Sequence, residues 1–150
     1  MRFKYAVITL IVWLGHGLLC AFLKRGLFSD LQRPRAMLDN SLLHFVPNVD
    51  VHSFHSFPSG HTATMFCFAV LLSLLLRKRW ISIVLLVLAV LVGYSRIYLL
   101  QHFLMDVAVG AAVGVIVTWA VWWFFESARL PGWMDQYLKL NAKVSVTLAR

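Results

Sequence analysis

Residues 103–125 read FLMDVAVGAAVGVIVTWAVWWFF, an apolar run with one charged side chain, Asp106. A helix needs about 20 consecutive apolar residues to cross a membrane, so this run is long enough. Three further apolar stretches come before it, at residues 5–23, 62–76 and 80 to about 95. The shorter two reach the required length if the second begins near Pro58 and the third continues toward Leu100. We therefore predict an all-α transmembrane helix bundle with about four spans.

The composition of the whole chain agrees with a membrane protein. Hydrophobic residues make up 61% of its 150 residues and charged residues 13%, whereas soluble domains are about 45–50% apolar and about 25% charged. The net charge of +8 comes from Lys and Arg that lie between the apolar stretches. We expect them at membrane surfaces and expect no nucleic-acid partner. The length suits a single membrane domain over residues 1–150.

The first apolar stretch follows Arg2 and Lys4 and could be a signal peptide. Its apolar part exceeds the usual length of about 7–15 residues, and no Ala-x-Ala cleavage site follows, which favours a retained helix. Cys20 and Cys67 fall within apolar stretches and are expected to be buried thiols. His16, inside the first stretch, is expected to make a contact between helices rather than to belong to a functional site.

The basic residues predict an orientation in the membrane. Cytoplasmic loops carry an excess of Lys and Arg, which places the N-terminus, residues 77–79 and the basic C-terminal tail inside. The loop of residues 24–61 and the turn of residues 96–102 then face outward together. Five basic residues on that outer side run against the excess of positive charge expected on the cytoplasmic side, which suggests a functional role for them. They are Lys24, Arg25, Arg33, Arg35 and Arg96.

Residues 57–62 read FPSGHT and come directly before an apolar helix. Ser59 can cap that helix, and Gly60 lets the main chain approach a ligand closely. The N–H groups of the first turn and the helix dipole stabilise a phosphate placed there, and His61 would stand beside it. Taken alone, the segment is also typical of an ordinary helix start with a spare histidine.

Residues 95–106 read SRIYLLQHFLMD and carry a second polar cluster. His102 and Asp106 are four residues apart, so on a helix they share a face and the carboxylate can accept the imidazole N–H. That contact leaves the other ring nitrogen free as a base or nucleophile. Arg96, before or at the start of that helix, offers a planar set of donors for phosphate oxygens. Charged groups at the edge of hydrocarbon are expensive, which favours a functional role.

Together with Lys24 and Arg33-Pro34 in the outer loop, these segments resemble the three motifs of the type 2 phosphatidic acid phosphatase family. That family is similar to vanadium haloperoxidases and glucose-6-phosphatase. Its Pro-Ser-Gly-His motif matches residues 58–61, and its Ser-Arg…His…Asp motif matches residues 95–106.

The first motif departs from the family pattern of Lys, six residues, then Arg-Pro. Eight residues separate Lys24 from Arg33 in this chain. The expansion leaves open whether Lys24 or Arg25 takes the lysine position. The resemblance covers about residues 20–125.

The resemblance implies a phosphoryl transfer in two steps without a metal or other cofactor. His102 would attack phosphorus and form a phosphohistidine, with Asp106 holding its ring. His61 would protonate the leaving oxygen and then activate water. The phosphate oxygens would be bound by Lys24, Arg33, Arg96 and the N–H groups around Ser59 and Gly60.

The resemblance also implies an integral membrane lipid phosphatase. Its substrate would be a lipid phosphate monoester or diphosphate of the phosphatidate, phosphatidylglycerophosphate, undecaprenyl diphosphate or lipid A type. The expected partners are that substrate and membrane lipids, with a homo-oligomer as a further expectation. The expected location is the bacterial inner membrane, with the active site facing the periplasm or the outside. Such phosphatases usually have six spans, so the family's first two helices would precede Tyr5.

Three alternatives stay open at the level of sequence. Zinc could be held by histidines and a carboxylate, although no spacing typical of a zinc site occurs; the candidate ligands are His52, His55, His61, His102 and Asp106. A haloperoxidase could hold vanadate in the same pocket, although those enzymes are usually soluble. A non-catalytic membrane subunit or anion-binding protein could use the same scaffold.

Overall fold

The computed structural model describes residues 3–38, 41, 46 and 53–128. Its helices, in chain order, are α1 (Phe3–Phe22), the π-helical turn η1 (Leu23–Leu27), α2 (Pro34–Met37), α3 (Gly60–Leu76), α4 (Arg79–Tyr98) and α5 (Leu104–Ser127). No strand occurs among these residues, so the prediction of an all-α fold is confirmed.

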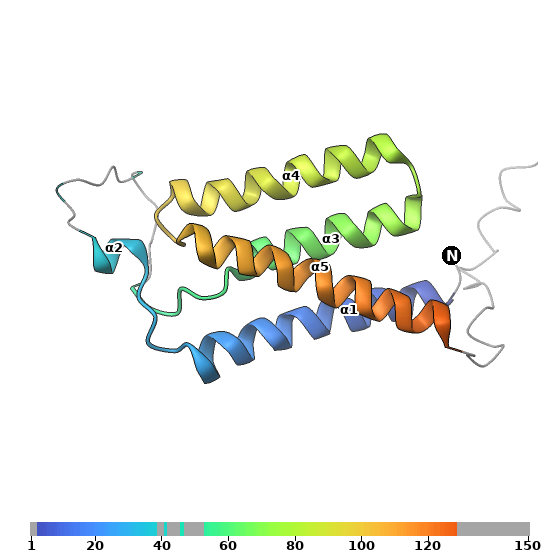
Figure 1. Ribbon diagram of the computed structural model, residues 1–150, viewed down its shortest axis with the longest axis horizontal. Helices are drawn as coiled ribbons and strands as arrows, with labels where there is room; N and C mark the ends of the chain where they lie inside the picture. Colours follow the sequence, from blue (N-terminus) through green and yellow to red (C-terminus); the bar gives the residue numbers. More distant parts are fainter. Residues whose placement is uncertain (1–2, 39–40, 42–45, 47–52, 129–150) are drawn as a thin grey trace, which may run out of the picture.

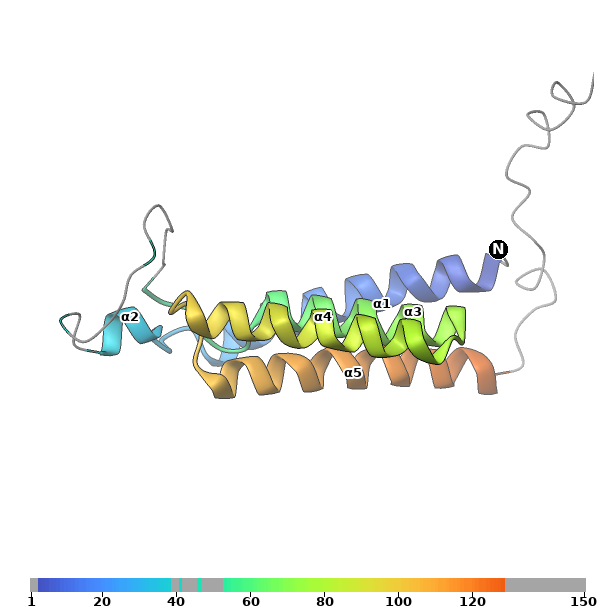
Figure 2. The ribbon, with the colours of Figure 1, turned by 90° about the horizontal axis from the view of Figure 1, so that it is seen from above.

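The four long helices run alternately in opposite directions and pack along their lengths (Figures 1 and 2). The end of the bundle that holds α2, the start of α3, the end of α4 and the start of α5 is called the loop end below. The N-terminus and the turn between α3 and α4 lie at the opposite end. The loop after α1 and the turn after α4 therefore lie together, as the charge pattern predicted.

Three helices are long and apolar enough to cross a membrane, namely Phe3–Leu27 (α1 with η1), α4 and α5. α3 is a shorter apolar helix of 17 residues, about 26 Å long at about 1.5 Å per residue. It begins at Gly60, two residues after the predicted start. α3 and α5 each pack against the other three long helices, so together they form the centre of the bundle.

α4 continues to Tyr98, in agreement with the prediction that this stretch runs toward Leu100, and Arg96 lies in its last turn, before the next helix. One detail of the sequence prediction is wrong. α5 begins only after His102, so His102 does not share a helical face with Asp106. The chain leaves α4 through Leu100, whose φ of 56° is left-handed and cannot continue a right-handed helix.

The contact between α3 and α5 depends on small residues. Gly110 and Gly114 lie one turn apart on α5, and a Cβ at Gly110 would lie 2.5 Å from the carbonyl oxygen of Ser59. Thr118, one turn further, donates to the sulfur of Cys67 at 3.2 Å. Small residues let helix backbones approach closely in a membrane, where no hydrophobic force drives helices together. The expected burial of Cys67 is confirmed, and Cys20 is buried as well.

The far end of the bundle joins α1 to α5. Lys4 Nζ lies 2.9 Å from Glu126 Oε1, and the rings of Tyr5 and Trp122 stack with their centroids 5.6 Å apart. These contacts hold the start of α1 against the end of α5, at the end of the bundle opposite the loop end.

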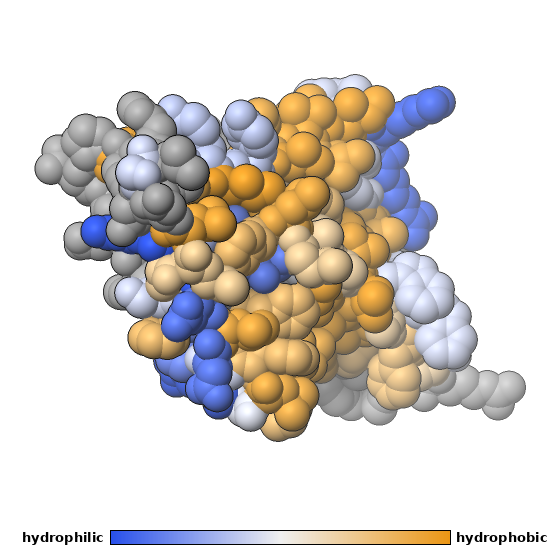
Figure 3. Space-filling model, turned by 60° about the vertical axis from the view of Figure 1, so that its left-hand side comes forward, coloured by the Kyte–Doolittle hydropathy of each residue, from blue (hydrophilic) through white to orange (hydrophobic). Residues whose placement is uncertain are grey.

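The outer faces of the helices are apolar. Large hydrophobic side chains are exposed along α1, α4 and α5, and Trp80, Leu91 and Ile116 each expose more than half of their surface. Figure 3 shows a broad hydrophobic surface with hydrophilic side chains gathered toward its edges. Exposing such a large apolar surface to water is energetically unfavourable, whereas the hydrocarbon of a bilayer can cover it. The chain is an integral membrane protein.

We predict that Gly114→Ala destabilises the bundle by about 1–3 kcal/mol, since overpacking a close contact costs this much. A Cβ at Gly114 would lie 2.9 Å from the backbone nitrogen of Cys67 and 3.0 Å from Phe66 Cβ. Gly17→Ala is the matched control, because a Cβ there meets nothing within 4 Å. Thermal unfolding in detergent measures both variants, and equal midpoints would contradict this account of the α3–α5 contact.

Candidate active site

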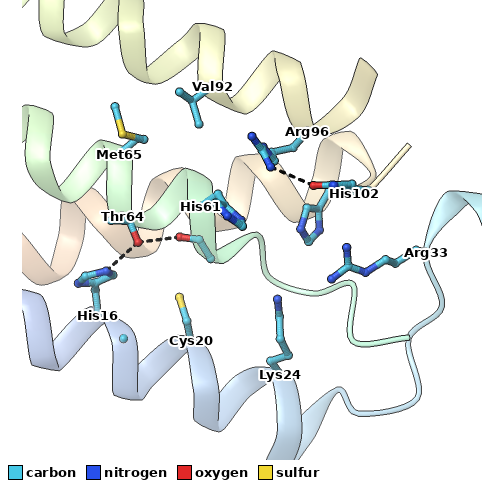
Figure 4. A pocket seen from close by; sticks show the side chains of 13 residues that line it. His16, Cys20, Lys24, Arg33, His61, Thr64, Met65, Val92, Arg96 and His102 are labelled. Atoms are coloured by element: carbon cyan, nitrogen blue, oxygen red, sulfur yellow. Dashed lines mark hydrogen bonds between the residues drawn. The ribbon is translucent and has the colours of Figure 1, made fainter. Parts of the chain in front are cut away.

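A cavity of about 740 Å³ opens at the loop end between α1, α3 and α4. Basic side chains and histidines from five separate segments line it (Figure 4), namely Lys24, Arg33, His61, Arg96 and His102. The sequence predicted all five as site residues. The fold brings them together because α3 and α5 begin, and α1 and α4 end, at the same end of the bundle.

The structure directs Lys24 rather than Arg25 toward the cavity. Lys24 lines it from the π-helical turn that follows α1, whereas Arg25 is exposed and is not among the lining residues. Arg33 approaches from the other side, just before α2, and its Nε donates to the carbonyl of Phe54 at 3.1 Å. The wider spacing between these two basic residues is thus taken up by the turn and the loop.

His102 is almost fully buried, with 2% of its surface exposed. Its Nδ1 lies 3.4 Å from Asp106 Oδ2 and makes no hydrogen bond within the described part of the chain. Asp106 stands in the first turn of α5, and its Oδ2 also accepts the backbone N–H of Phe103 at 3.0 Å. The predicted pair is therefore present, but the helix-start turn brings the two side chains together in place of a shared helical face.

Ser56 also contacts Asp106, and the sequence did not indicate this contact. Its hydroxyl donates to Asp106 Oδ2, and 1% of its surface is exposed. Two donors on one oxygen hold the carboxylate beside the imidazole. A serine in a loop 50 residues away along the chain carries no sequence pattern that could have revealed this contact.

Burial lowers the pKa of His102 below its ordinary value, because a charged imidazolium loses solvation. The contact with Asp106 opposes this shift in the pKa, while the nearby positive charges of Arg33 and Lys24 reinforce it. The imidazole is therefore neutral near pH 7, with the ring nitrogen away from Asp106 available to react.

Ser59 does not line the cavity, although the sequence predicted a phosphate contact there. Its backbone N–H donates to the carbonyl of Asp106 at 2.9 Å, and its hydroxyl pairs with the hydroxyl of Thr62 at 2.9 Å. Ser59 occupies the N-cap position of α3 without a side-chain cap bond. Its backbone N–H connects α3 to α5, its hydroxyl contacts a residue of α3, and the neighbouring Gly60 is the residue that lines the cavity.

Arg96 carries a donor without an acceptor. One terminal nitrogen, Nη1, donates to Gln101 Oε1 at 3.0 Å, and Gln101 also lines the cavity. The buried Nε has no hydrogen-bond partner within residues 3–38, 41, 46 and 53–128. Burying a guanidinium N–H without an acceptor costs the free energy of its lost hydration. An anion bound in the cavity would supply the missing acceptor.

His16 makes the expected contact between helices. Its Nδ1 lies 2.9 Å from the carbonyl oxygen of Val12, and its Nε2 lies 3.0 Å from Thr64 Oγ1 on α3. His16 and Thr64 also line the inner end of the cavity, which the sequence did not indicate.

The described part of the chain holds no cluster of ligands that would support the zinc alternative. No group of three or more His, Cys, Asp or Glu residues is arranged there to hold a metal ion. His55 lies in a separate cavity beside Arg33, and His52 falls outside the described residues.

The sequence profile of the PAP2 superfamily matches residues 4–130. The chain is 41% identical over 63 residues to a lipid A 4'-phosphatase of Bacteroides thetaiotaomicron, covering 42% of this chain and 28% of that protein. It is 36% identical over 94 residues to phosphatidylglycerophosphatase B of Bacillus subtilis, covering 57% and 46%. This chain thus spans less than half the length of either relative.

A solved structure has the same fold. The crystal structure of Aquifex aeolicus LpxE superposes with a TM-score of 0.69 at 31% sequence identity. The match covers 81% of this chain and 69% of that one.

We predict that His102 titrates below pH 6.5, since burial and the two neighbouring cations outweigh the carboxylate in setting its pKa. The ring then loses its neutral form only as the pH falls below the ordinary histidine range. NMR of histidine-labelled protein in detergent measures this pKa, with His102→Gln used to assign the signal. A pKa at or above 6.5 would contradict the account of its surroundings.

Proposed function

We propose a function for this chain on the premise that it belongs to the PAP2 superfamily. It is an integral membrane phosphatase that hydrolyses a lipid phosphate monoester or diphosphate. One observation carries the proposal: three cations and two histidines from distant segments line a single cavity at the end of an apolar bundle. The bundle of α1, α3, α4 and α5 is the one domain that carries this activity.

The first step is attack by His102. Its Nε2 forms a bond to phosphorus while the bond from phosphorus to the lipid oxygen breaks, and His61 gives its proton to that oxygen. Asp106 lies 3.4 Å from Nδ1, where it stabilises the positive charge that develops on the ring. The product of this step is a phosphohistidine and a free lipid alcohol.

The second step restores the enzyme. His61, now neutral, removes a proton from water, and the water oxygen attacks phosphorus as the bond to Nε2 breaks. Inorganic phosphate leaves and His102 is neutral again. His61 suits this exchange because it is exposed to the cavity from the first turn of α3.

The basic side chains supply most of the catalysis. Unaided hydrolysis of phosphate monoesters is so slow that enzymes reach accelerations of up to about 10²¹-fold. Fixed positive groups around the transferring phosphoryl group act where water is excluded, which strengthens each interaction. The groups that bind phosphate oxygens are Lys24, Arg33, Arg96 and the main chain at Gly60, with Ser59 holding that segment in place.

The lipid is of the phosphatidate, phosphatidylglycerophosphate, undecaprenyl diphosphate or lipid A type. Two relatives carry names of lipid phosphatases, for lipid A and for phosphatidylglycerophosphate. The cavity opens at one end of helices whose outer faces are apolar, so a lipid headgroup reaches it while the acyl chains stay in the bilayer.

The protein sits in the bacterial inner membrane with the loop end facing the periplasm or the outside. Lys4 and the basic residues 77–79 gather at the opposite end, as expected for a cytoplasmic face. Three of the five cations at the loop end, Lys24, Arg33 and Arg96, are accounted for by the phosphate that they bind.

We predict that His102→Ala abolishes phosphate release from these lipids while the protein stays folded, because the nucleophile is lost. Purified protein is assayed on a panel of lipids with and without a chelator, and wild-type activity is expected to survive the chelator. Ser82→Ala is the control, since this half-buried serine donates to the carbonyl of Lys78, the residue before α4, and does not line the cavity. Full activity of His102→Ala would exclude His102 as the nucleophile, and no phosphate release from wild-type protein would favour a non-catalytic binding protein instead.

We predict that His61→Ala slows hydrolysis of a lipid monoester more than hydrolysis of a lipid diphosphate. A lipid alkoxide is a poor leaving group and needs an acid, whereas the phosphate monoester that leaves from a diphosphate depends on the acid less. Rates on matched prenyl monophosphate and diphosphate lipids measure the difference. Equal losses on both substrates would exclude His61 as the acid.

A further inference from the structure

The cavity extends well beyond the place where the phosphate binds. Along α1 and η1 it is lined by Lys24, Cys20 and His16, at intervals of four residues on one face. Lys24 lies eight positions after His16, a rise of about 12 Å along the axis. A phosphate held by the cations at the loop end fills only the outer part, so the inner part faces the portion of the substrate next to it.

The inner part is apolar except for one hydrogen-bonded pair. Met65 and Val92 line it from α3 and α4. Next to Met65 on α3, Thr64 Oγ1 lies 3.0 Å from His16 Nε2 and 3.0 Å from the carbonyl oxygen of Gly60 (Figure 4). A buried histidine and an exposed hydroxyl therefore meet inside a membrane helix bundle, at the wall of the cavity.

The hydrogen atoms of this pair can be assigned in two ways. The carbonyl of Val12 only accepts, so the Nδ1 of His16 carries a hydrogen. If Nε2 also carries one, it donates to Thr64, whose hydroxyl donates to Gly60. If Nε2 carries none, the hydroxyl donates to it instead. A hydroxyl oxygen has two acceptor lone pairs, so Thr64 Oγ1 keeps at least one lone pair for a further donor in both cases.

We propose that Thr64, oriented by His16, determines substrate specificity by accepting a hydrogen bond from an amide N–H or a hydroxyl of the lipid. Thr64 lies three residues after His61, so its side chain stands about 5–6 Å from that of the acid, one turn further into the bundle. A donor three bonds from the ester oxygen that His61 protonates lies up to about 3.8 Å from that oxygen, so hydrogen bonds to the two side chains can span their separation. The inference rests on the proposed lipid phosphatase function.

An acceptor at Thr64 selects substrates that carry a hydrogen-bond donor near the phosphate. Lipid phosphates with an N-acyl group or a free hydroxyl beside the phosphate ester present such a donor. A diacyl phosphate with two ester links presents only acceptors, and a prenyl phosphate presents neither. The enzyme therefore prefers the first class, since a polar site rejects an analogue that lacks the matching group.

The test uses two lipids that differ in a single group. One is ordinary phosphatidate, and the other carries the same acyl chain at the middle carbon through an amide N–H. Wild-type protein in mixed micelles is expected to show a higher kcat/KM for the amide lipid. Thr64→Val is expected to lower kcat/KM for the amide lipid by about fivefold, the size of one neutral hydrogen bond, with little change for phosphatidate.

Two further variants separate a ligand contact from a structural role. Thr64→Ser keeps the hydroxyl and is expected to keep the preference. Thr9→Val is the matched control, because the Thr9 hydroxyl also bonds to a carbonyl four residues earlier, at 2.8 Å to Tyr5, and lies outside this cavity. A free hydroxyl in place of the amide tells whether both kinds of donor are accepted.

Each outcome bears on one claim. Equal kcat/KM of the wild type for the two lipids, or equal losses on both in Thr64→Val, overturns the role of Thr64 and leaves the phosphatase function standing. Absence of phosphate release from every lipid in wild-type protein overturns the proposed function, and the specificity with it.

Discussion

One backbone hydrogen bond sets the geometry on which the site depends. The N–H of Ser59 donates to the carbonyl of Asp106 at 2.9 Å, which joins the start of α3 to the first turn of α5. Gly110 lies one turn further along α5, where a side chain would strike Ser59. The two helix starts can therefore approach closely enough for His61 and His102 to line one cavity. The absence of a side chain at Gly110 therefore contributes to the site by letting the start of α3 approach α5.

The charges of the site balance only when an anion is present. Lys24, Arg33 and Arg96 are positive, and Asp106 is the carboxylate that faces His102, so the three cations and one anion leave a net charge of +2. A phosphate monoester carries about −1.5 to −2 at pH 7. Burying uncompensated cations beside hydrocarbon costs several kcal/mol, and a phosphate offsets that cost. Burial also keeps His102 neutral, so the same low dielectric that penalises the cations prepares the nucleophile.

Much of the fold and of the site could be predicted from the sequence. The apolar runs predicted the helices because lipid accepts only segments that satisfy their own backbone hydrogen bonds. The two complete motifs predicted His61, Arg96, His102 and Asp106, and all but Asp106 line the cavity directly. Lys24 could not be separated from Arg25, since the turn that directs one of them inward is a local deviation from the α-helix.

Other features depend on contacts that no local pattern records. Ser56 reaches Asp106 across 50 residues of chain, and His16 reaches Thr64 across 48. The predicted helical face shared by His102 and Asp106 was wrong, because a left-handed residue at Leu100 ends α4 and a new helix starts beyond His102. A spacing of four residues fits a helix and a helix-start turn alike, so spacing alone could not distinguish them.

In the proposed mechanism, His102 carries the phosphoryl group between substrate and water. The most direct measurement is to mix protein with a lipid phosphate, stop the reaction within one turnover at alkaline pH, where phosphohistidine survives, and locate the modification by peptide mass spectrometry. We expect a phosphate on His102 that disappears as turnover is completed. A phosphate on another residue, or complete hydrolysis with no modified peptide at any time, would contradict it.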